Sequence, residues 1–211
     1  MTWENFRVAL FDKAPQALFE HSLIVVMTIT IAILISVPLG VLLTRPKFKR
    51  FGLVILNILN VLQAIPGLAM IALALPILGL GIKPAVLALL FQSLLPIVRN
   101  TMAGLVGVNA DVKEAARGMS PLRLLLEVEI PLAMPIILSG IRTATVYVVS
   151  IGTLAALIGA GGLGNLIMGG LALFRAEYLL VGAGLGALMA IVLERSLCYL
   201  EYKITPPGMR V

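Results

Sequence analysis

Long stretches of apolar residues without a single charge constrain this chain more than any other feature. Residues 23–43 form one such stretch, and residues 51–82, 84–98, 143–174 and 178–193 form four more. A helix needs about 20 apolar residues to cross the hydrocarbon core of a bilayer, and a backbone in lipid has to satisfy its own hydrogen bonds. The sequence therefore predicts an all-α integral membrane protein with about five transmembrane helices, at about 22–44, 53–75, 85–106, 138–158 and 178–199.

The composition agrees with a chain that is surrounded by lipid. Hydrophobic residues make up 60% of the 211 residues and charged residues only 12%, whereas soluble domains have roughly one half and one quarter. The net charge of +6 does not indicate nucleic-acid binding, because the basic residues flank the apolar runs. The single cysteine, Cys198, excludes a disulfide within the chain. We expect one transmembrane domain over residues 1–211.

The basic residues predict how the chain is oriented. If the N-terminus is outside, the loop after the first helix, the loop at residues 107–131 and the tail at residues 200–211 are all cytoplasmic. With Arg195 at the inner end of the last helix included, the cytoplasmic side then holds ten Lys and Arg residues, and the outside holds four. Cytoplasmic loops carry an excess of Lys and Arg, so we expect the N-terminus outside and the C-terminus inside.

The first residues of the chain have an amphipathic pattern. Trp3, Phe6 and Leu10 recur at helical spacing within residues 1–21. We expect this external segment to contain a short helix that lies at the membrane interface, and a disordered end is the alternative.

One segment in the middle of the chain departs from the apolar composition. Residues 111–129 carry seven charged side chains. Asn109 is suited to cap a first helix, and Gly118 suits the left-handed position that ends one. Ser120 and Pro121 then supply the N-cap and the first-turn proline of a second helix. We expect two short helices, which either lie on the bilayer surface as an amphipathic hairpin or dock on a cytoplasmic partner.

The second of these helices has an apolar face, formed by Leu122, Leu125 and Leu126. Pro131 and Pro135 are expected to separate it from the next transmembrane helix. The chain contains no G-x-x-x-x-G-K-[ST] motif that would cradle the phosphates of a nucleotide. If its work is powered by ATP, the ATPase therefore has to be a separate subunit.

This charged segment also carries a resemblance to a known family. "EAARGM", followed by "VEIPLAMP", resembles the EAA loop of the permeases of importer-type ABC transporters. "LLPIVRNTMAGL", "GIRTATV" and "IGTLAALIGAGGLG" are similar to one branch, the permease subunits of osmoprotectant uptake systems. The resemblance covers roughly residues 20–205. It implies the fold of type I importer permeases (MetI-like) and the import of glycine betaine, carnitine, choline or a related compound.

The resemblance also implies residue roles in the charged loop. The motif's Glu, Ala and Ala fall on Glu114, Ala115 and Ala116, which in the family form a coupling helix that sits in a groove of the ATPase subunit. Where the family motif has a glycine, this chain has Ser120, and its loop is two residues shorter than usual. Two residues turn a helix by about 200°, so we expect the shortening at the break between the helices, with Gly118 as the hinge.

The partners and the location are likewise implied by the resemblance. We expect a dimer of ABC ATPase subunits that binds ATP and Mg²⁺, a second permease copy or paralogue, a substrate-binding protein on the outer face, and the lipid bilayer. This chain itself is expected to hold no cofactor and no metal, to perform no catalysis and to bind no nucleic acid. The location implied is the cytoplasmic (inner) membrane of a bacterium or archaeon, crossed several times.

A glycine-rich run, "GAGGLG" at residues 159–164, fits the pattern G-x-G-x-x-G. It does not indicate a dinucleotide site, because it follows a predicted membrane helix rather than a strand, and because the first charge after it is Arg175 rather than an acid. We interpret it as a tight turn with close helix packing on the outer face, near the place where the resemblance puts the substrate-binding protein.

Two arginines, Arg99 and Arg142, lie inside predicted membrane helices. A charge at the centre of a bilayer costs about 2.5–3.5 kcal/mol on insertion scales. Counting residues along each helix, however, places both arginines near the inner interface. They either reach the interface and pair with other groups, or they form a gate at the cytoplasmic mouth.

Polar side chains form two stripes on the predicted membrane helices. Ser139, Thr143, Ser150 and Thr153 fall within about 80° of one helical face, with Tyr147 beside them. On the second helix, Asn57, Asn60 and Gln63 lead to the Pro66–Gly67 break. The stripes either bond neighbouring helices or line a pathway for a hydrophilic solute. The predicted pathway residues are Gln63, Pro66, Tyr147, Ser150 and Thr153.

The sequence therefore predicts the permease subunit of an ATP-driven importer for a quaternary-ammonium osmoprotectant. An importer permease for another small solute, such as an amino acid, is the first alternative. A channel subunit is a further class, but no segment resembles a selectivity filter or a charged ring. An ion-coupled transporter is another, but no internal repeat is obvious and no Asp or Glu lies deep in a predicted helix.

Overall fold

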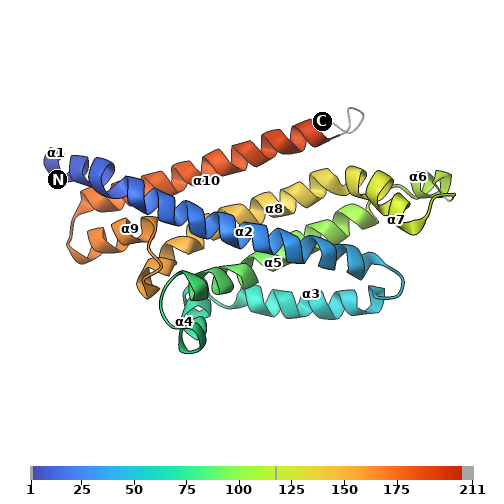
Figure 1. Cartoon of the computed structure of the whole chain (residues 1–211), viewed down its shortest axis with the longest axis horizontal. Helices are drawn as coiled ribbons and strands as arrows, with labels where there is room; N and C mark the ends of the chain where they lie inside the picture. Colours follow the sequence, from blue (N-terminus) through green and yellow to red (C-terminus); the bar gives the residue numbers. More distant parts are fainter. Residues whose placement is uncertain (1, 117, 206–211) are drawn as a thin grey trace.

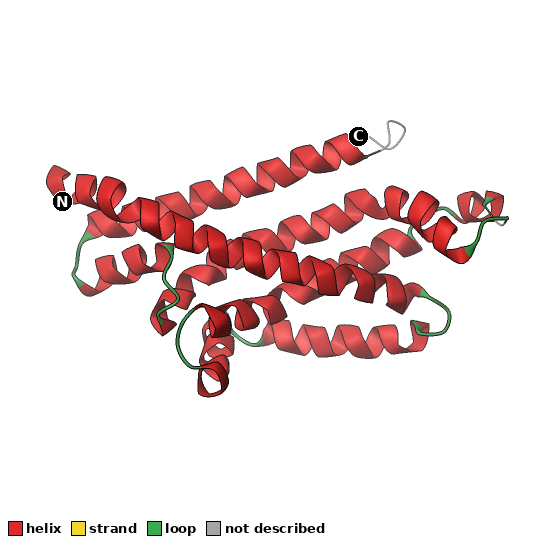
Figure 2. Ribbon diagram, viewed as in Figure 1, coloured by secondary structure: helices red, strands yellow, loops and turns green. Residues whose placement is uncertain are grey.

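The computed structural model describes residues 2–116 and 118–205, which form helices joined by turns, without a strand (Figures 1 and 2). Most helices lie along one long axis, and their connections gather at two opposite ends (Figure 1). We name these the charged end, where residues 107–131 lie, and the glycine end, where residues 159–164 lie. The predicted all-α membrane fold is confirmed, and the loops alternate between the two ends as the predicted topology requires.

The chain begins with one continuous helix of 42 residues, Trp3–Thr44. It consists of α1 (Trp3–Arg7), a π-helical segment (Val8–Lys13) and α2 (Ala14–Thr44). The predicted helix near the N-terminus is present, but it continues into α2 instead of ending as a short helix of its own, and its place at the membrane interface stays a prediction. The segment is helical, but its alanines Ala9, Ala14 and Ala17 are buried in a cluster with side chains of α9 and α10, which holds it in line with α2.

The second predicted helix is broken in two. α3 (Lys49–Ala64) and α4 (Gly67–Leu78) meet at an angle of 95°, so a single helix over residues 53–75 is wrong. Ile65 is extended, as residues before a proline prefer, and Pro66 has no N–H to continue the helix. The 16 residues of α3 span only about 24 Å, less than the hydrocarbon thickness of about 30 Å.

After α5 (Ile82–Val106), the charged loop forms α6 (Ala110–Ala115) and α7 (Pro121–Leu124). A π-helical turn (Leu125–Glu129) then leads into α8 (Ile130–Gly152), which a 3-10 segment (Thr153–Ile158) extends. The whole stretch Pro121–Ile158 is one helix of 38 residues. The predicted break at Pro131 and Pro135 is therefore wrong: Pro131 directly follows the π-helical turn, where the regular hydrogen-bond ladder already changes, and Pro135 is accommodated inside α8.

The chain closes with α9 (Leu163–Ala172), a short helix that the sequence did not predict, and α10 (Ala176–Ile204). Four helices are long and apolar enough to cross a membrane, and the bent pair α3–α4 makes up to five. In the most apolar window of each helix, 67% of α5 is buried but only 17% of α10. α5 is thus the centre of the fold, and α10 is left open to lipid or to another chain.

The core is built from α2, α5 and α8, which cross one another along the long axis (Figure 1). Ile24, Leu89 and Val148, one from each of these helices, are almost fully buried in one cluster. Close approach needs small residues: a Cβ added to Gly40 would lie 2.7 Å from Thr101, and one added to Gly140 would lie 2.7 Å from the carbonyl oxygen of Pro96. These glycines therefore let α2 and α8 pack tightly against α5.

The glycine run at residues 159–164 is a tight turn, as predicted. Gly159, Gly161 and Gly162 have φ values of 72°, 82° and 82°, a region that other residues rarely adopt. A Cβ on Gly164 would overlap the carbonyl oxygen of Thr153. This run therefore reverses the chain and seats α9 directly on the 3-10 segment.

The close contact at Gly164 generates a prediction. Gly164→Ala should lower the free energy of unfolding by about 1–3 kcal/mol, the usual cost of overpacking, because the obstacle is backbone and cannot rotate away. Gly169→Ala is the matched control in the same helix: its Cβ would meet nothing within 4 Å, and it should be neutral or stabilise by up to about 1 kcal/mol. Thermal unfolding in detergent measures both, and equal melting temperatures for the two variants would contradict the packing described here.

Candidate functional site

The charged loop has the local structure that its sequence indicates. The Asn109 side chain accepts a hydrogen bond from the backbone N–H of Asp111 (2.8 Å), and the Ser120 hydroxyl accepts one from that of Arg123 (3.4 Å). Both predicted N-caps are confirmed. Arg117 lies outside the described residues, and the left-handed conformation expected at the adjacent Gly118 stays a prediction.

The predicted coupling residues lie around the end of α6. Glu114 and Ala115 are exposed in its last turn, and Ala116 caps its C-terminus. Ser120 opens α7, so residues 118–120, where we expect the shortening, lie between the two helices, and the position of the shortening itself stays a prediction. A deletion between the two helices does not rotate the exposed face of either helix.

Apolar side chains of the charged loop are exposed near Glu114. Val112 is 40% exposed, Leu122 65% and Leu126 54%, whereas Leu125 turns inward and packs on the buried cluster of α5 and α8. No residue of α6 or α7 is buried. Exposed apolar groups beside charged ones are typical of a surface that another protein covers.

A buried carboxylate lies beneath the charged loop. Glu129 is 5% exposed. Its Oε2 is 2.6 Å from a guanidinium nitrogen of Arg45, at the end of α2, and its Oε1 is 3.7 Å from Nζ of Lys113 in α6. Sequence reasoning gave Glu129 no role.

A cleft runs between α8 and α10, and we name it the α8–α10 cleft. Its part nearer the glycine end has a volume of about 350 Å³ and is lined by Ser150 and Thr153, with small residues of α10 opposite. Its other part, of about 420 Å³, is lined by Arg142, Tyr147 and Glu194. Val146 borders both parts. The structure thus brings together four of the predicted pathway and gate residues.

The remaining predicted residues lie elsewhere, around the bend between α3 and α4. The Gln63 side chain donates to the carbonyl oxygen of Gln92 in α5 (3.4 Å), and Gln92 in turn donates to that of Ile65 (2.7 Å). Pro66, beside this bond, is exposed. These bonds are interhelical, the first of the two interpretations given for the stripe, and they fasten the bend to α5.

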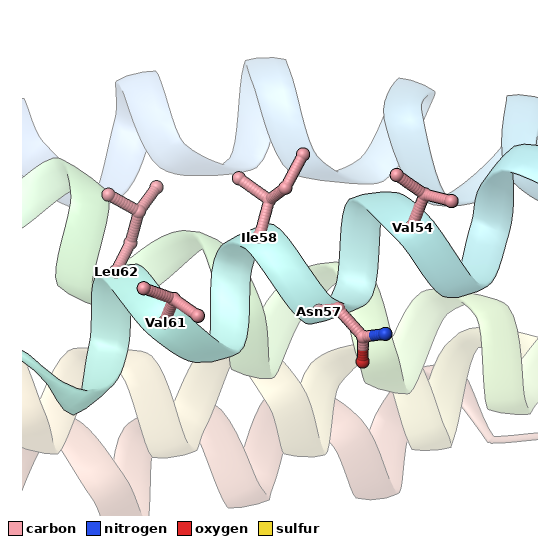
Figure 3. Close-up of a pocket in the computed structure, with 5 residues that line it drawn as sticks. All are labelled: Val54, Asn57, Ile58, Val61 and Leu62. Atoms are coloured by element: carbon pink, nitrogen blue, oxygen red, sulfur yellow. The ribbon is translucent and has the colours of Figure 1, made fainter.

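A groove on the outer side of α3 is lined by apolar residues apart from Asn57. This shallow groove of about 390 Å³ is lined by five residues of α3, and Asn57 points away from Val54, Ile58 and Leu62 (Figure 3). Asn57 therefore does not continue the polar stripe formed by Asn60 and Gln63.

Both membrane arginines have partners in the structure. A guanidinium nitrogen of Arg99 donates to Oδ1 of Asn60 in α3 (2.8 Å). Arg142 lies 3.9 Å from a carboxylate oxygen of Glu194 and 3.4 Å from one of Glu201, both in α10. Glu194 also lies 3.7 Å from the guanidinium group of its neighbour Arg195. Pairing lowers the cost of holding these charges in a membrane helix, and Arg142 links α8 to α10 across the cleft.

Two polar residues at the start of the first apolar run contact distant segments, one the glycine turn and one α8, and sequence reasoning missed both contacts. Oε2 of Glu20 accepts a hydrogen bond from the backbone N–H of Gly162 (2.8 Å). Nε2 of His21, which is fully buried, lies 3.0 Å from the carbonyl oxygen of Val149 in α8. The signal in the sequence was only an adjacent polar pair at the edge of an apolar run.

Comparison with known proteins gives this arrangement a context. Residues 36–205 match the family described as "Binding-protein-dependent transport system inner membrane component". The choline transport system permease protein OpuBB of Bacillus subtilis is 45% identical over 194 residues, which cover 91% of this chain and 88% of that protein. The carnitine transport permease protein OpuCB of Listeria monocytogenes is 42% identical, with 91% and 88% covered. The osmoprotectant import permease protein OsmY of Salmonella typhimurium is 43% identical, with 89% and 80% covered.

The fold also has a counterpart among solved structures. An inward-facing conformation of the MetNI methionine ABC transporter superposes with a TM-score of 0.84 at 19% sequence identity, and the match covers 98% of this chain and 100% of that one. At this identity the likeness concerns the fold alone.

The bond at the bend between α3 and α4 generates a prediction. Gln92→Leu should destabilise the protein by about 1–3 kcal/mol, the cost of leaving a buried polar group unpaired, because the carbonyl of Ile65 loses its donor. Gln63→Leu removes a longer bond from a half-buried side chain and should cost less than half as much. Thermal unfolding of the two variants measures the difference, and a larger loss in Gln63→Leu would mean that Gln92 does not hold the bend.

Proposed function

The chain belongs to the family of binding-protein-dependent transport system inner membrane components, and we propose that it imports a quaternary-ammonium osmoprotectant such as glycine betaine, carnitine or choline. The observation that carries the solute class is its 42–45% identity, over nine-tenths of the chain, to permeases named for these solutes. An importer permease for another small solute is the alternative, since the MetNI methionine transporter shares the fold.

In this proposal ATP is hydrolysed by a separate dimer of ABC ATPase subunits, which binds ATP and Mg²⁺, and this chain performs no catalysis itself. The ATPase docks on the charged loop. The support is local: Glu114 and Ala115 are exposed beside a short capped helix, and exposed Val112, Leu122 and Leu126 offer apolar contact. Such a loop leaves the lipid and can receive force from a partner.

The charged end is therefore proposed to be cytoplasmic, with the N-terminus outside, in the inner membrane of a bacterium or archaeon. The excess of Lys and Arg in the cytoplasmic regions of this arrangement supports it. A substrate-binding protein docks at the opposite, glycine end.

The pathway is proposed to run along the α8–α10 cleft and to be completed by a second permease copy or a paralogue. The open surface of α10 leaves room for that partner. The cleft suits the solute chemically, because a trimethylammonium group needs no hydrogen-bond donor and is attracted to aromatic faces. Tyr147, 47% exposed, offers such a face, and Ser150 and Thr153 offer hydroxyl oxygens.

Arg142 is proposed as a gate within the same cleft. Its ion pairs with Glu194 and Glu201 join α8 to α10 at the cleft. All three side chains are 23–37% exposed, so solvent screens the pairs and they open at small cost. Nucleotide-driven closure of the ATPase, transmitted through the charged loop, would then open the cleft alternately toward the outside and toward the cytoplasm. Arg99, by contrast, is held by Asn60 away from the cleft.

The proposal is tested by reconstituting the complex in proteoliposomes. Uptake of labelled glycine betaine or choline should require the substrate-binding protein outside and ATP inside, on the side of the charged loop. An ion gradient alone should drive none. Uptake that proceeds without ATP would favour a channel or an ion-coupled transporter instead.

The pathway generates a prediction of its own. Ser150→Trp should reduce uptake at least tenfold, because an indole fills part of the 350 Å³ cleft, and a barrier higher by about 1.4 kcal/mol is already tenfold in rate. Ser150→Ala, which removes only a hydroxyl group, should keep most of the uptake. Both variants should assemble with the ATPase. Normal uptake by Ser150→Trp would mean that the polar stripe only packs helices.

A further inference from the structure

We propose that Glu129 is the joint through which movement of the charged loop reaches the membrane helices α2, α5 and α8. The inference rests on the proposed function, because it concerns how force from the ATPase is passed on. It adds a positioning residue that is distinct from the docking residues at the end of α6.

Glu129 connects segments that are far apart in the sequence. It lies directly before α8, and its carboxylate bonds Arg45, the residue that caps the C-terminus of α2, at 2.6 Å. Its other oxygen is 3.7 Å from Lys113 of α6. Arg45 also donates from Nε to the carbonyl oxygen of Val41 (3.3 Å) and is thereby fixed to the last turn of α2.

Lys113 extends this network to a third membrane helix. Its ammonium group donates to the carbonyl oxygen of Leu105 (2.8 Å) in the last turn of α5. Carbonyls in the last turn of a helix have no partner within the helix and attract cations. One lysine of the loop therefore bridges the end of α5 and the carboxylate that leads into α8.

The burial of the carboxylate distinguishes this network from an ordinary surface ion pair. The Glu129 side chain is 6% exposed, and those of Arg45 and Lys113 are 32% and 31% exposed. Two residues earlier, Glu127 pairs with Arg123 at 3.0 Å, but these side chains are 52% and 69% exposed. A buried charge that loses its partners is costly, whereas an exposed pair contributes little. The Glu129 network therefore holds its elements together more firmly than the Glu127–Arg123 pair does.

The backbone hydrogen-bond pattern changes at this position. Glu129 is the last residue of the π-helical turn Leu125–Glu129. Single π-helical turns inside α-helices are rare and occur frequently at functional sites. This turn joins α7 to α8 in one continuous helix, so displacement of the loop is transmitted along the helix axis, while the carboxylate carries it sideways to α2 and α5.

The test uses the complete transporter with its ATPase and substrate-binding protein, reconstituted in proteoliposomes. Glu129→Gln keeps the shape of the side chain and removes its charge. We expect the amount of glycine betaine or choline imported per ATP hydrolysed to fall roughly fivefold or more, the lower end of the factors by which coupled sites usually affect one another. The ATPase should remain bound, because Glu114 to Ala116 are unchanged.

A second variant keeps the test decisive if Glu129→Gln assembles poorly. Arg45→Gln changes a partly exposed residue at the end of α2 that is outside the charged loop, and it should lower the same ratio. Glu127→Gln is the matched control, and its ratio should equal that of the unmodified protein. The charge exchange Arg45→Glu with Glu129→Arg should recover part of the loss, which a purely steric role would not explain.

The outcomes separate this inference from the proposed function. If the unmodified complex shows no ATP-dependent uptake, the proposed function itself fails. If it does, but Glu129→Gln and Arg45→Gln import as much solute per ATP as Glu127→Gln, Glu129 is not the joint and the inference is overturned.

Discussion

Hydrocarbon offers no hydrogen bonds, and this constraint governs the whole structure. Inside a bilayer every backbone N–H and C=O has to be paired within the chain, so the apolar runs can only be helices. Departures from regular helix fall where a side chain or another backbone segment supplies the missing partner. Gln92 donates to the carbonyl of Ile65 at the bend after α3, and Glu20 accepts from the backbone of Gly162 in the glycine turn.

The same constraint explains where the charges lie. Within the described residues, the two arginines of the membrane helices are bonded: Arg99 to Asn60 in α3, and Arg142 to Glu194 and Glu201 in α10. Residues 107–131, which we propose leave the lipid, expose acidic and apolar groups side by side. The proposed mechanism thus divides the chain into a membrane part that has to remain helical and a loop that binds and moves with a partner, with Glu129 where the two meet.

The sequence predicted the parts of this arrangement that depend on local pattern. Apolar runs located the membrane helices, and the residue types at Asn109 and Ser120 located both caps of the charged loop. Prolines were less informative: Pro66 ends a helix, whereas Pro131 and Pro135 lie within one. The difference depends on where each falls relative to the helix start and on what satisfies the freed carbonyl, which a single sequence does not reveal.

Contacts between distant segments were beyond prediction for a physical reason. Arg45 and Glu129 are 84 residues apart, and His21 and Val149 are 128 apart, and no local pattern marks such pairs. The polar stripe on α8 was predicted from helical periodicity, and four of the residues named there and at the gate now line one cleft. Gln63 followed the same periodicity but bonds to α5, because periodicity gives the face of a helix and not what lies opposite.

The ATPase is proposed to bind at the end of α6, and copurification of the ATPase with this chain tests that binding most directly. The ATPase should copurify with the unmodified chain and with Ala116→Ser, which adds one oxygen atom. It should be lost from Ala116→Trp, because the half-buried Ala116 leaves no room for an indole between the loop and a docked partner. If Ala116→Trp retains the ATPase in full and its hydrolysis is still stimulated by loaded substrate-binding protein, the charged loop does not dock there, and the interpretation of the loop as a hairpin on the membrane surface replaces it.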